Sequence, residues 1–432
     1  MALASGDKKP TPVSGPLPGA GALLRFGGGV RALEVPLYAV VQRTTVLRVE
    51  WGLNKSEFIG HIGFIVKAKD AEMNSPLLYQ WTEMIDKAFP SLGRWQKLTL
   101  ALFSYGVLLA HSCSLSIVGC HLSGKAENSS RERRLQRWLA NERLVLQVLF
   151  GWWIAWVLRL WGKATLLVLI DETKLSDHVA VMMVGVAYRA SAIPLIWRAY
   201  DPADSPEEGQ VALMSALLDQ LRALIPAEQS VLLLADRGLG TSPQWQERLS
   251  HSGWPYLLRV QGSTRIRLPN HKPQPLRHLV GYGQTWSGRG QVFKKAGWQW
   301  KWVYLVWEVG YAEPWCLFSN QADIPPTLYG IRAQHECSFR DLKSDGFQWQ
   351  RSRVWLPSHV ERLLLVLALA SLWALTEGTK VVHLYPLTRR QQRLSVFRLG
   401  LDYLFERFHT LQSKCLELYL APDTPLLKSV VT

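Results

Sequence analysis

Four side chains in the last third of the chain have types and a spacing suited to chemistry on phosphates: Tyr329, Arg332, Glu336 and Lys343. They follow the pattern Y-x2-R-x3-E-x6-K, and on a single helix these offsets predict that all four lie on one face. A carboxylate flanked by cations suits a site that holds a metal ion and grips phosphates. Such a site needs further carboxylates from other elements.

Two aspartates follow apolar runs that are typical of buried strands. Asp171 directly follows the run ATLLVLI, and Asp236 directly follows the run VLLLA. If these strands are parallel neighbours, both carboxylates emerge at the same edge of the sheet, where ligands commonly bind. Glu336 would then complete a cluster of three carboxylates, which suits Mg²⁺ because this ion prefers hard oxygen ligands.

Other interpretations of these carboxylates stay open at the level of sequence. A single Asp after a strand is often a turn former or a helix cap. Glu172 and Asp177 compete with Asp171 for the first position, and we prefer Asp171 because it directly ends the apolar run. The Tyr-Arg-Glu-Lys pattern is the specific part of the signal.

The elements that must position these carboxylates follow a recognisable order. After residue 164 the pattern predicts three strands, a helix, a strand, a helix and a last strand. This order is that of the ribonuclease H-like fold, an α/β fold with a mixed five-stranded sheet and helices on its faces. The expected ranges are strands 164–170, 179–189 and 192–200, helix 211–225, strand 231–235, helix 243–252 and strand 256–260.

Composition indicates a polyanionic partner. The chain has 432 residues and a formal net charge of +15, which favours nucleic acid through contacts to phosphates. Some of its 20 Trp could stack on bases, although most are expected in the core. Five Cys without C-x2-C pairs argue against a disulfide framework and a zinc ribbon.

Two apolar runs raise the alternative of a membrane protein. They cover residues 144–158 and 363–375, and both are shorter than the roughly 20 residues of a spanning helix. We therefore expect buried core helices and no membrane partner.

The N-terminal part divides into two regions. Residues 1–72 are rich in Pro and Gly with weak periodicity, so we expect a disordered or spurious leader, and Met73 as a possible natural start. Residues 73–150 are helical in pattern, with a basic excess between Arg94 and Arg143. This favours a small DNA-binding domain, with a solvated charged helix face as the alternative.

Taken together, these motifs resemble the DDE transposases of bacterial insertion sequences, in the group marked by the Y-R-E-K signature. The resemblance covers roughly residues 80 to 380. It implies that Asp171, Asp236 and Glu336 are the catalytic, metal-binding triad, with Mg²⁺ as cofactor and Mn²⁺ as a substitute. It also implies that Tyr329, Arg332 and Lys343 hold DNA phosphates.

The family carries a β-rich insertion between the second Asp and the Glu, and here those residues lie 100 positions apart. Residues 257–307 contain no Asp or Glu and several Trp, which fits a groove that follows a DNA backbone. A β-meander with half-buried aromatics is the alternative. By resemblance, Trp315 would stack a flipped base. The basic residues of this stretch are Arg259, Arg265, Arg267, Lys272, Arg277, Arg289, Lys294, Lys295 and Lys301, of which Arg259, Lys294 and Lys295 are our predicted DNA contacts.

The resulting expectation is a cytoplasmic, nucleoid-associated transposase that acts as a homodimer on double-stranded DNA, at terminal inverted repeats and at target DNA. Two alternatives are a ribonuclease H-like nuclease without strand transfer and an inactive, DNA-binding transposase remnant. The expected division is leader 1–72, helical domain 73–150, catalytic core 151–260 and 322–380, insertion 261–321 and helical tail 381–432.

Overall fold

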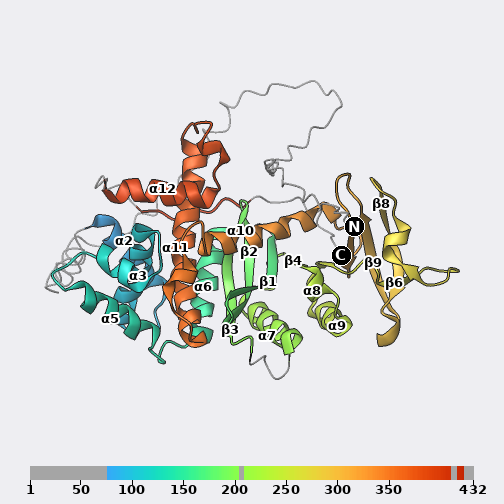
Figure 1. Cartoon of the computed structure of the whole chain (residues 1–432), viewed down its shortest axis with the longest axis horizontal. Helices are drawn as coiled ribbons and strands as arrows, with labels where there is room; N and C mark the ends of the chain where they lie inside the picture. The colour runs from blue at the N-terminus through green and yellow to red at the C-terminus, as the bar shows by residue number, and fades with distance from the viewer. Residues whose placement is uncertain (1–74, 204–208, 410–415, 423–432) are drawn as a thin grey trace, which may run out of the picture. The chain divides into compact units, whose positions relative to one another are not determined.

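The computed structural model describes residues 75–203, 209–409 and 416–422 (Figure 1). Our predictions for the leader 1–72 and for a start at Met73 lie outside the described residues. Residues 69–432 form one compact unit.

All described strands belong to one ten-stranded sheet with the order β3-β2-β1-β4-β5-β10-β9-β8-β6-β7. The first five positions are the predicted ribonuclease H-like sheet, because β2 pairs antiparallel with β1 and β3, while β1, β4 and β5 run parallel. The strands are β1 (Leu166–Ser176), β2 (Val179–Tyr188), β3 (Ser191–Tyr200), β4 (Val231–Ala235), β5 (Tyr256–Arg259), β6 (Arg265–Arg267), β7 (Gln274–Pro275), β8 (Thr285–Val292), β9 (Gln299–Val306) and β10 (Trp315–Ser319).

Helices surround this sheet, and those before β1 confirm the predicted helical pattern. Four of them, α6, α7, α10 and α11, contact β3. The α-helices are α2 (Pro76–Ala88), α3 (Arg94–Ala110), α4 (Leu115–His121), α5 (Asn128–Leu139), α6 (Leu146–Trp161), α7 (Gly209–Leu224), α8 (Arg237–Gly240), α9 (Pro243–Ser252), α10 (Ala333–Leu342), α11 (Pro357–Leu384) and α12 (Val396–His409). Short 3-10 helices are η1 (Leu276–Leu279), η2 (Lys294–Ala296), η3 (Pro326–Arg332), η4 (Trp349–Ser352) and η5 (Gln391–Arg393).

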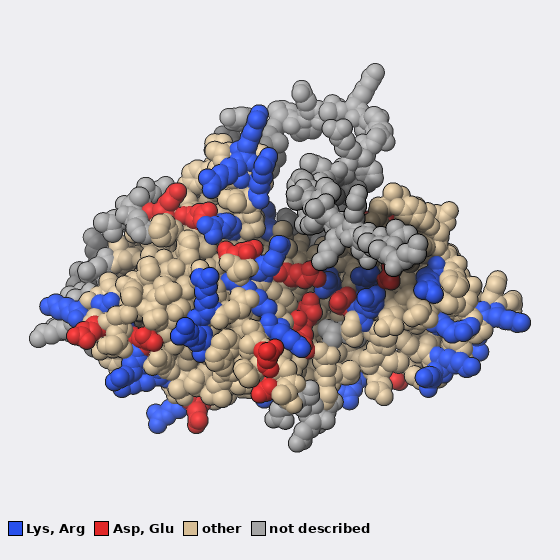
Figure 2. Space-filling model, viewed as in Figure 1, with Lys and Arg blue, Asp and Glu red and all other residues tan. Residues whose placement is uncertain are grey.

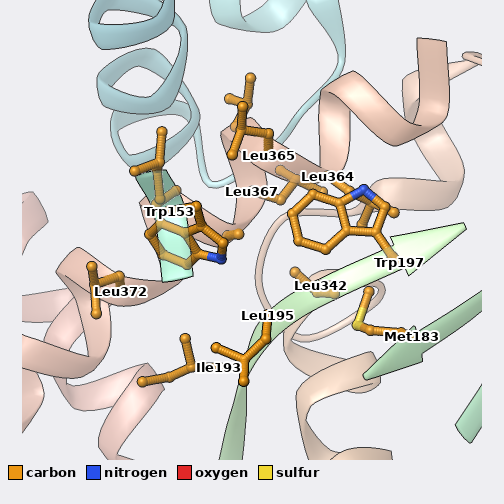
Figure 3. Packing of buried hydrophobic residues seen from close by; sticks show 14 of the residues in the cluster. Trp153, Met183, Ile193, Leu195, Trp197, Leu342, Leu364, Leu365, Leu367 and Leu372 are labelled. Atoms are coloured by element: carbon orange, nitrogen blue, oxygen red, sulfur yellow. The ribbon is translucent and has the colours of Figure 1, made fainter. Parts of the chain in front are cut away.

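The main core joins the N-terminal helices to the sheet. Trp153 of α6 and Trp197 of β3 are fully buried together with leucines of α11 (Figure 3). Trp153 donates its indole N–H to the backbone oxygen of Pro194 at 2.8 Å, so this large ring is buried without an unpaired donor. The ring centroids of Trp81 on α2 and Trp373 on α11 lie 4.5 Å apart. The helices before β1 and the ribonuclease H-like sheet therefore share one core.

The long helix α11 corrects our reasoning about membranes. The apolar run 363–375 is part of a 28-residue helix, which is long and apolar enough to cross a membrane, so shortness does not exclude a span. Burial gives a different explanation, because 89% of its most apolar window lies inside the protein. Gly378 allows α12 to approach closely, since a Cβ there would lie 1.8 Å from the backbone oxygen of Val396.

The insertion continues the ribonuclease H-like sheet, because β10 pairs antiparallel with β5 and is followed by β9 and β8. The alternating segment at 298–307 forms β9, as predicted. The expected boundary after residue 150 falls inside α6, and the one after residue 380 falls inside α11, so neither is a linker. The domain division otherwise stays a prediction.

Candidate active site

Strand register brings Asp171 and Asp236 next to each other. In the parallel pair of β1 and β4, Ile170 lies opposite Ala235, and β4 ends there. Asp236 then caps the short helix α8, accepting the backbone N–H of Arg237 at 2.6 Å. We expected the first strand to end directly before Asp171, but β1 continues to Ser176, because its later residues still pair with β2.

Asp171 lies in a partly buried position with compensating donors. It accepts the backbone N–H of Glu172 at 2.8 Å, and Arg332 Nη1 lies 3.1 Å from its Oδ2 atom. Burial raises the pKa of this carboxyl to about 6, although both donors act in the opposite direction and the nearby carboxylates of Asp236 and Glu336 raise it further. The three carboxylates therefore share one electrostatic environment.

The alternatives for the first position are engaged elsewhere. Glu172 follows Asp171 in the strand, so its side chain leaves the opposite face of the sheet. Its carboxylate accepts hydrogen bonds from the hydroxyl of Tyr200 and from Nε2 of Gln210, the latter at 2.5 Å. Asp177 is exposed in the turn between β1 and β2. The preference for Asp171 over these two therefore has a geometric reason.

The spacing predicted that the Tyr-Arg-Glu-Lys residues lie on a single helix, but the structure divides them between two helices. Tyr329 and Arg332 belong to the 3-10 helix η3, Glu336 belongs to α10, and Lys343 is the residue that ends α10. The residues before Arg332 wind more tightly, with i to i+3 hydrogen bonds, which rotates Tyr329 around the helix axis relative to an α-helix.

Two of these side chains, Tyr329 and Arg332, still contact the two aspartates, and Lys343 contacts β1 just beyond Asp171. Tyr329 donates its hydroxyl to Asp236 Oδ1 at 3.2 Å, and burial raises the pKa of this phenol above its usual range. Lys343 Nζ donates to Thr173 Oγ1 at 2.7 Å and to the backbone oxygen of Lys174 at 2.8 Å. Burial lowers the pKa of Lys343.

Arg332 lies between two of the three carboxylates, because its guanidinium pairs with Asp171 and with Glu336. Carboxylate oxygens are suitable donors for a hard divalent cation. In residues 75–203, 209–409 and 416–422, however, no three His, Cys, Asp or Glu side chains converge closely enough to form a ready metal site. The donor chemistry fits a divalent cation, while the charge of Arg332 compensates Asp171 and Glu336 in this arrangement.

The remaining predicted DNA-binding residues divide into two groups. Trp315 is half-buried at the start of β10, and its ring packs edge-on against Tyr329 with centroids 5.3 Å apart. Arg259 is half-buried at the end of β5 and lines a cavity of about 790 Å³ with Arg237 and Arg277. Lys294 and Lys295 are exposed in η2, between β8 and β9, so the fold does not bring them to the carboxylates.

Two residues at the site were not predicted from sequence. Thr173 positions Lys343, and it lies two residues after Asp171, on the same face of β1. Arg237 begins α8 beside Asp236, and its guanidinium pairs with Glu313 at 3.2 Å. Alternation along a strand would place Thr173 on the same face as Asp171, but the sequence did not indicate that β1 continues beyond Asp171.

Comparison with known families gives one finding. Residues 186–373 match the family model of the transposase DDE domain. This range includes Asp236 and the Tyr-Arg-Glu-Lys residues, whereas Asp171 precedes it. No curated protein matches the chain. The ribonuclease H-like sheet agrees with this match, and together they support a DDE transposase.

Proposed function

We propose that this transposase cuts DNA at the ends of its element and joins them to a target, using Asp171, Asp236 and Glu336 as the catalytic triad. The observation that carries the assignment is the register of β1 and β4, which sets Asp171 beside Asp236. Tyr329, Arg332 and Lys343 surround the same point, through contacts to Asp236, Asp171 and Thr173.

The triad would hold divalent cations, Mg²⁺ or Mn²⁺, which when bound activate the nucleophile and stabilise the leaving oxygen. In the first reaction a water oxygen attacks the phosphorus, the bond to the 3′ oxygen breaks, and a free 3′-OH and a 5′-phosphate result. In the second reaction that 3′-OH attacks another phosphodiester. Both reactions are phosphoryl transfers, so one set of carboxylates can serve both.

The basic side chains have separate roles in this proposal. Arg332 would leave Glu336 and neutralise a DNA phosphate as charge develops in the transition state. Lys343 is held against Thr173 and would contribute a second fixed cation. Tyr329 orients Asp236 through its hydroxyl, and Trp315 packs edge-on against the ring of Tyr329.

The proposed partners are the terminal inverted repeats and target DNA, both double-stranded. Joining two ends requires that they be held together, so a homodimer on DNA is proposed. The net charge of +15 favours association with the nucleoid in the cytoplasm.

The decisive experiment measures cleavage of a labelled DNA end taken from the repeats that flank the gene. Mg²⁺-dependent nicking by the wild type, lost with EDTA and in Glu336→Gln while end binding persists, would support the assignment. Joined products would establish strand transfer. Hydrolysis alone would favour a nuclease, and salt-sensitive binding without any cleavage would favour an inactive remnant.

A further inference from the structure

The insertion strands have two different faces. On β8, the residues Trp286, Gly288, Gly290 and Val292 face one side, and Thr285, Ser287, Arg289 and Gln291 face the other. The first side is covered: Val292 and Ile266 are fully buried, and a Cβ at Gly290 would lie 2.4 Å from Ile266. The second side is the open face discussed below.

The open face combines arginines with tryptophans across neighbouring strands. Arg289 lies opposite Trp302 in the ladder, with its guanidinium carbon 5.9 Å from that ring and 5.3 Å from the ring of Trp300. Arg267 lies 4.5 Å from the ring of Trp298. Trp300 is 48% exposed, although an indole of this size is usually covered.

One arginine of this face is also held by a hydrogen bond to a neighbouring strand. Arg267 donates Nε to Gln291 Oε1 at 2.7 Å, and Gln291 lies opposite Trp300. The guanidinium groups are therefore partly preorganised beside aromatic surfaces. Residues 257–307 contain no Asp or Glu, so no acidic side chain of these strands neutralises the face. Figure 2 shows Lys and Arg over the insertion strands on the right, with few acidic residues among them.

The open face lies on the same side of the sheet as Tyr329. Trp302 packs against the cluster that contains Tyr304, Leu328 and Tyr329, and Trp315 belongs to that cluster as well. Four inter-strand steps separate β4 from β8 in the sheet. At about 4.8 Å per step this is roughly 20 Å, on the order of six nucleotides of one DNA strand at about 3.4 Å each.

We propose that this open face, formed by Arg267, Arg289, Gln291, Trp298, Trp300 and Trp302, binds an unpaired DNA strand that extends from the catalytic site. The inference rests on the proposed function. Exposed indoles stack on bases of any sequence, and arginines beside them neutralise the backbone, which is the combination that single-stranded DNA requires. Duplex DNA has its bases stacked internally, so an exposed indole offers it much less.

The test compares binding of a labelled 20-nucleotide single strand and of the same sequence as a blunt duplex by the full chain. Trp300→Ala and Arg289→Gln should each weaken single-strand binding about tenfold while weakening duplex binding much less. Trp300→Phe should restore most of the affinity, because it keeps an aromatic surface. The matched control is Trp152→Ala on α6, since Trp152 is 41% exposed and lies outside both the insertion and the expected DNA-binding domain 73–150, and it should change neither affinity.

Unchanged single-strand affinity in Trp300→Ala would overturn the proposal, and so would an equal loss for single strand and duplex. Cleavage is measured separately on the flanking repeat. If the wild type does not cleave but the variants lose single-strand binding selectively, the open face is supported and the proposed function fails. If cleavage occurs and the variants bind single strands like the wild type, the proposed function is supported and the role of the open face fails.

Discussion

In the half of the sheet built from β1, β4 and β5, the charges of the candidate site are paired with one another, whereas β6 and β8 carry arginines beside exposed or half-buried tryptophans. Asp171 is matched by Arg332, and Asp236 by the hydroxyl of Tyr329. Arg289 is matched only by rings among the contacts that the structure gives for it. One continuous sheet therefore combines a site in which partly buried charges need partners with a basic surface that is exposed to water.

The physical reason for this difference is burial. Strands covered on both faces exclude water, so a carboxylate at their end needs specific partners and responds strongly to its neighbours. On a face open to water, a charged side chain keeps its hydration, and each of its contacts contributes little to stability. Substitutions in the first half should therefore have large effects on catalysis or folding, and substitutions on the open face should mainly affect DNA binding.

The largest expected effect is on catalysis. Asp171→Asn should reduce the cleavage rate by about 10³-fold or more, because it removes a carboxylate that would hold the divalent cations. Binding of the DNA end should persist. Single-turnover cleavage and an electrophoretic binding assay measure the two quantities. Glu172→Gln is the control, since Glu172 faces the other side of β1. If Glu172→Gln abolished cleavage and Asp171→Asn did not, Glu172 and not Asp171 would be the first carboxylate.

The next prediction compares how much a substitution in each half of the sheet lowers the free energy of unfolding. Leu234→Ala on β4 should lower the free energy of unfolding by about 2–5 kcal/mol, because Leu234 is fully buried. Trp300→Ala on the open face should cost less than about 1 kcal/mol. Urea denaturation of both variants measures the difference. Equal losses would mean that the open face is part of the core.

A third prediction concerns pH and the buried Asp341 on α10. Burial raises the pKa of this carboxyl to about 7, although it accepts a hydrogen bond from Ser191 at 2.7 Å. Between about pH 4 and pH 7 the folded state therefore holds a proton that the unfolded chain has lost, so stability falls as pH rises.

Asp341→Asn keeps the acceptor for Ser191 without the charge. The variant should be more stable than the wild type above pH 7, by on the order of 2 kcal/mol, and the difference should vanish near pH 4. Thermal unfolding from pH 4 to pH 8 measures it. A constant difference across this range would show that ionisation of Asp341 is not the cause.

The smallest effect is expected at Lys301, which lies on β9 but not on the open face. Its Nζ donates to the hydroxyl of Tyr256 at 2.9 Å, and burial lowers its pKa to about 8. We counted it among the basic residues of the insertion, but it is buried and cannot contact DNA. Lys301→Met should leave the salt dependence of DNA binding unchanged, whereas Arg289→Gln should reduce its slope by about 1.

Stability provides a second measurement for the same residue. Because the folded pKa of Lys301 lies below the unfolded value, the unfolded chain binds more protons between about pH 8 and 10.5, so the wild type should gain stability with rising pH. The Met variant should lack this part of the gain. A changed salt slope in Lys301→Met would contradict the burial of its ammonium group.

The sequence by itself determined the local parts of this protein. Continuous apolar runs identified the buried strands of the ribonuclease H-like sheet, alternation identified β9, and the fixed offsets of Tyr329, Arg332, Glu336 and Lys343 predicted a phosphate-handling site. These signals are local because they depend on the repeat of a strand or on spacing along the chain. The matched transposase domain agrees with that interpretation.

Only the tertiary structure decided which of these residues meet and which sides they face. That β1 continues past Asp171 depends on pairing with β2, so neither Thr173 nor the opposite side chain of Glu172 could be assigned beforehand. The separation of Lys301 from Arg289 depends on which face of β9 is covered by other elements. Such choices depend on contacts between distant segments, and chain spacing does not encode them directly.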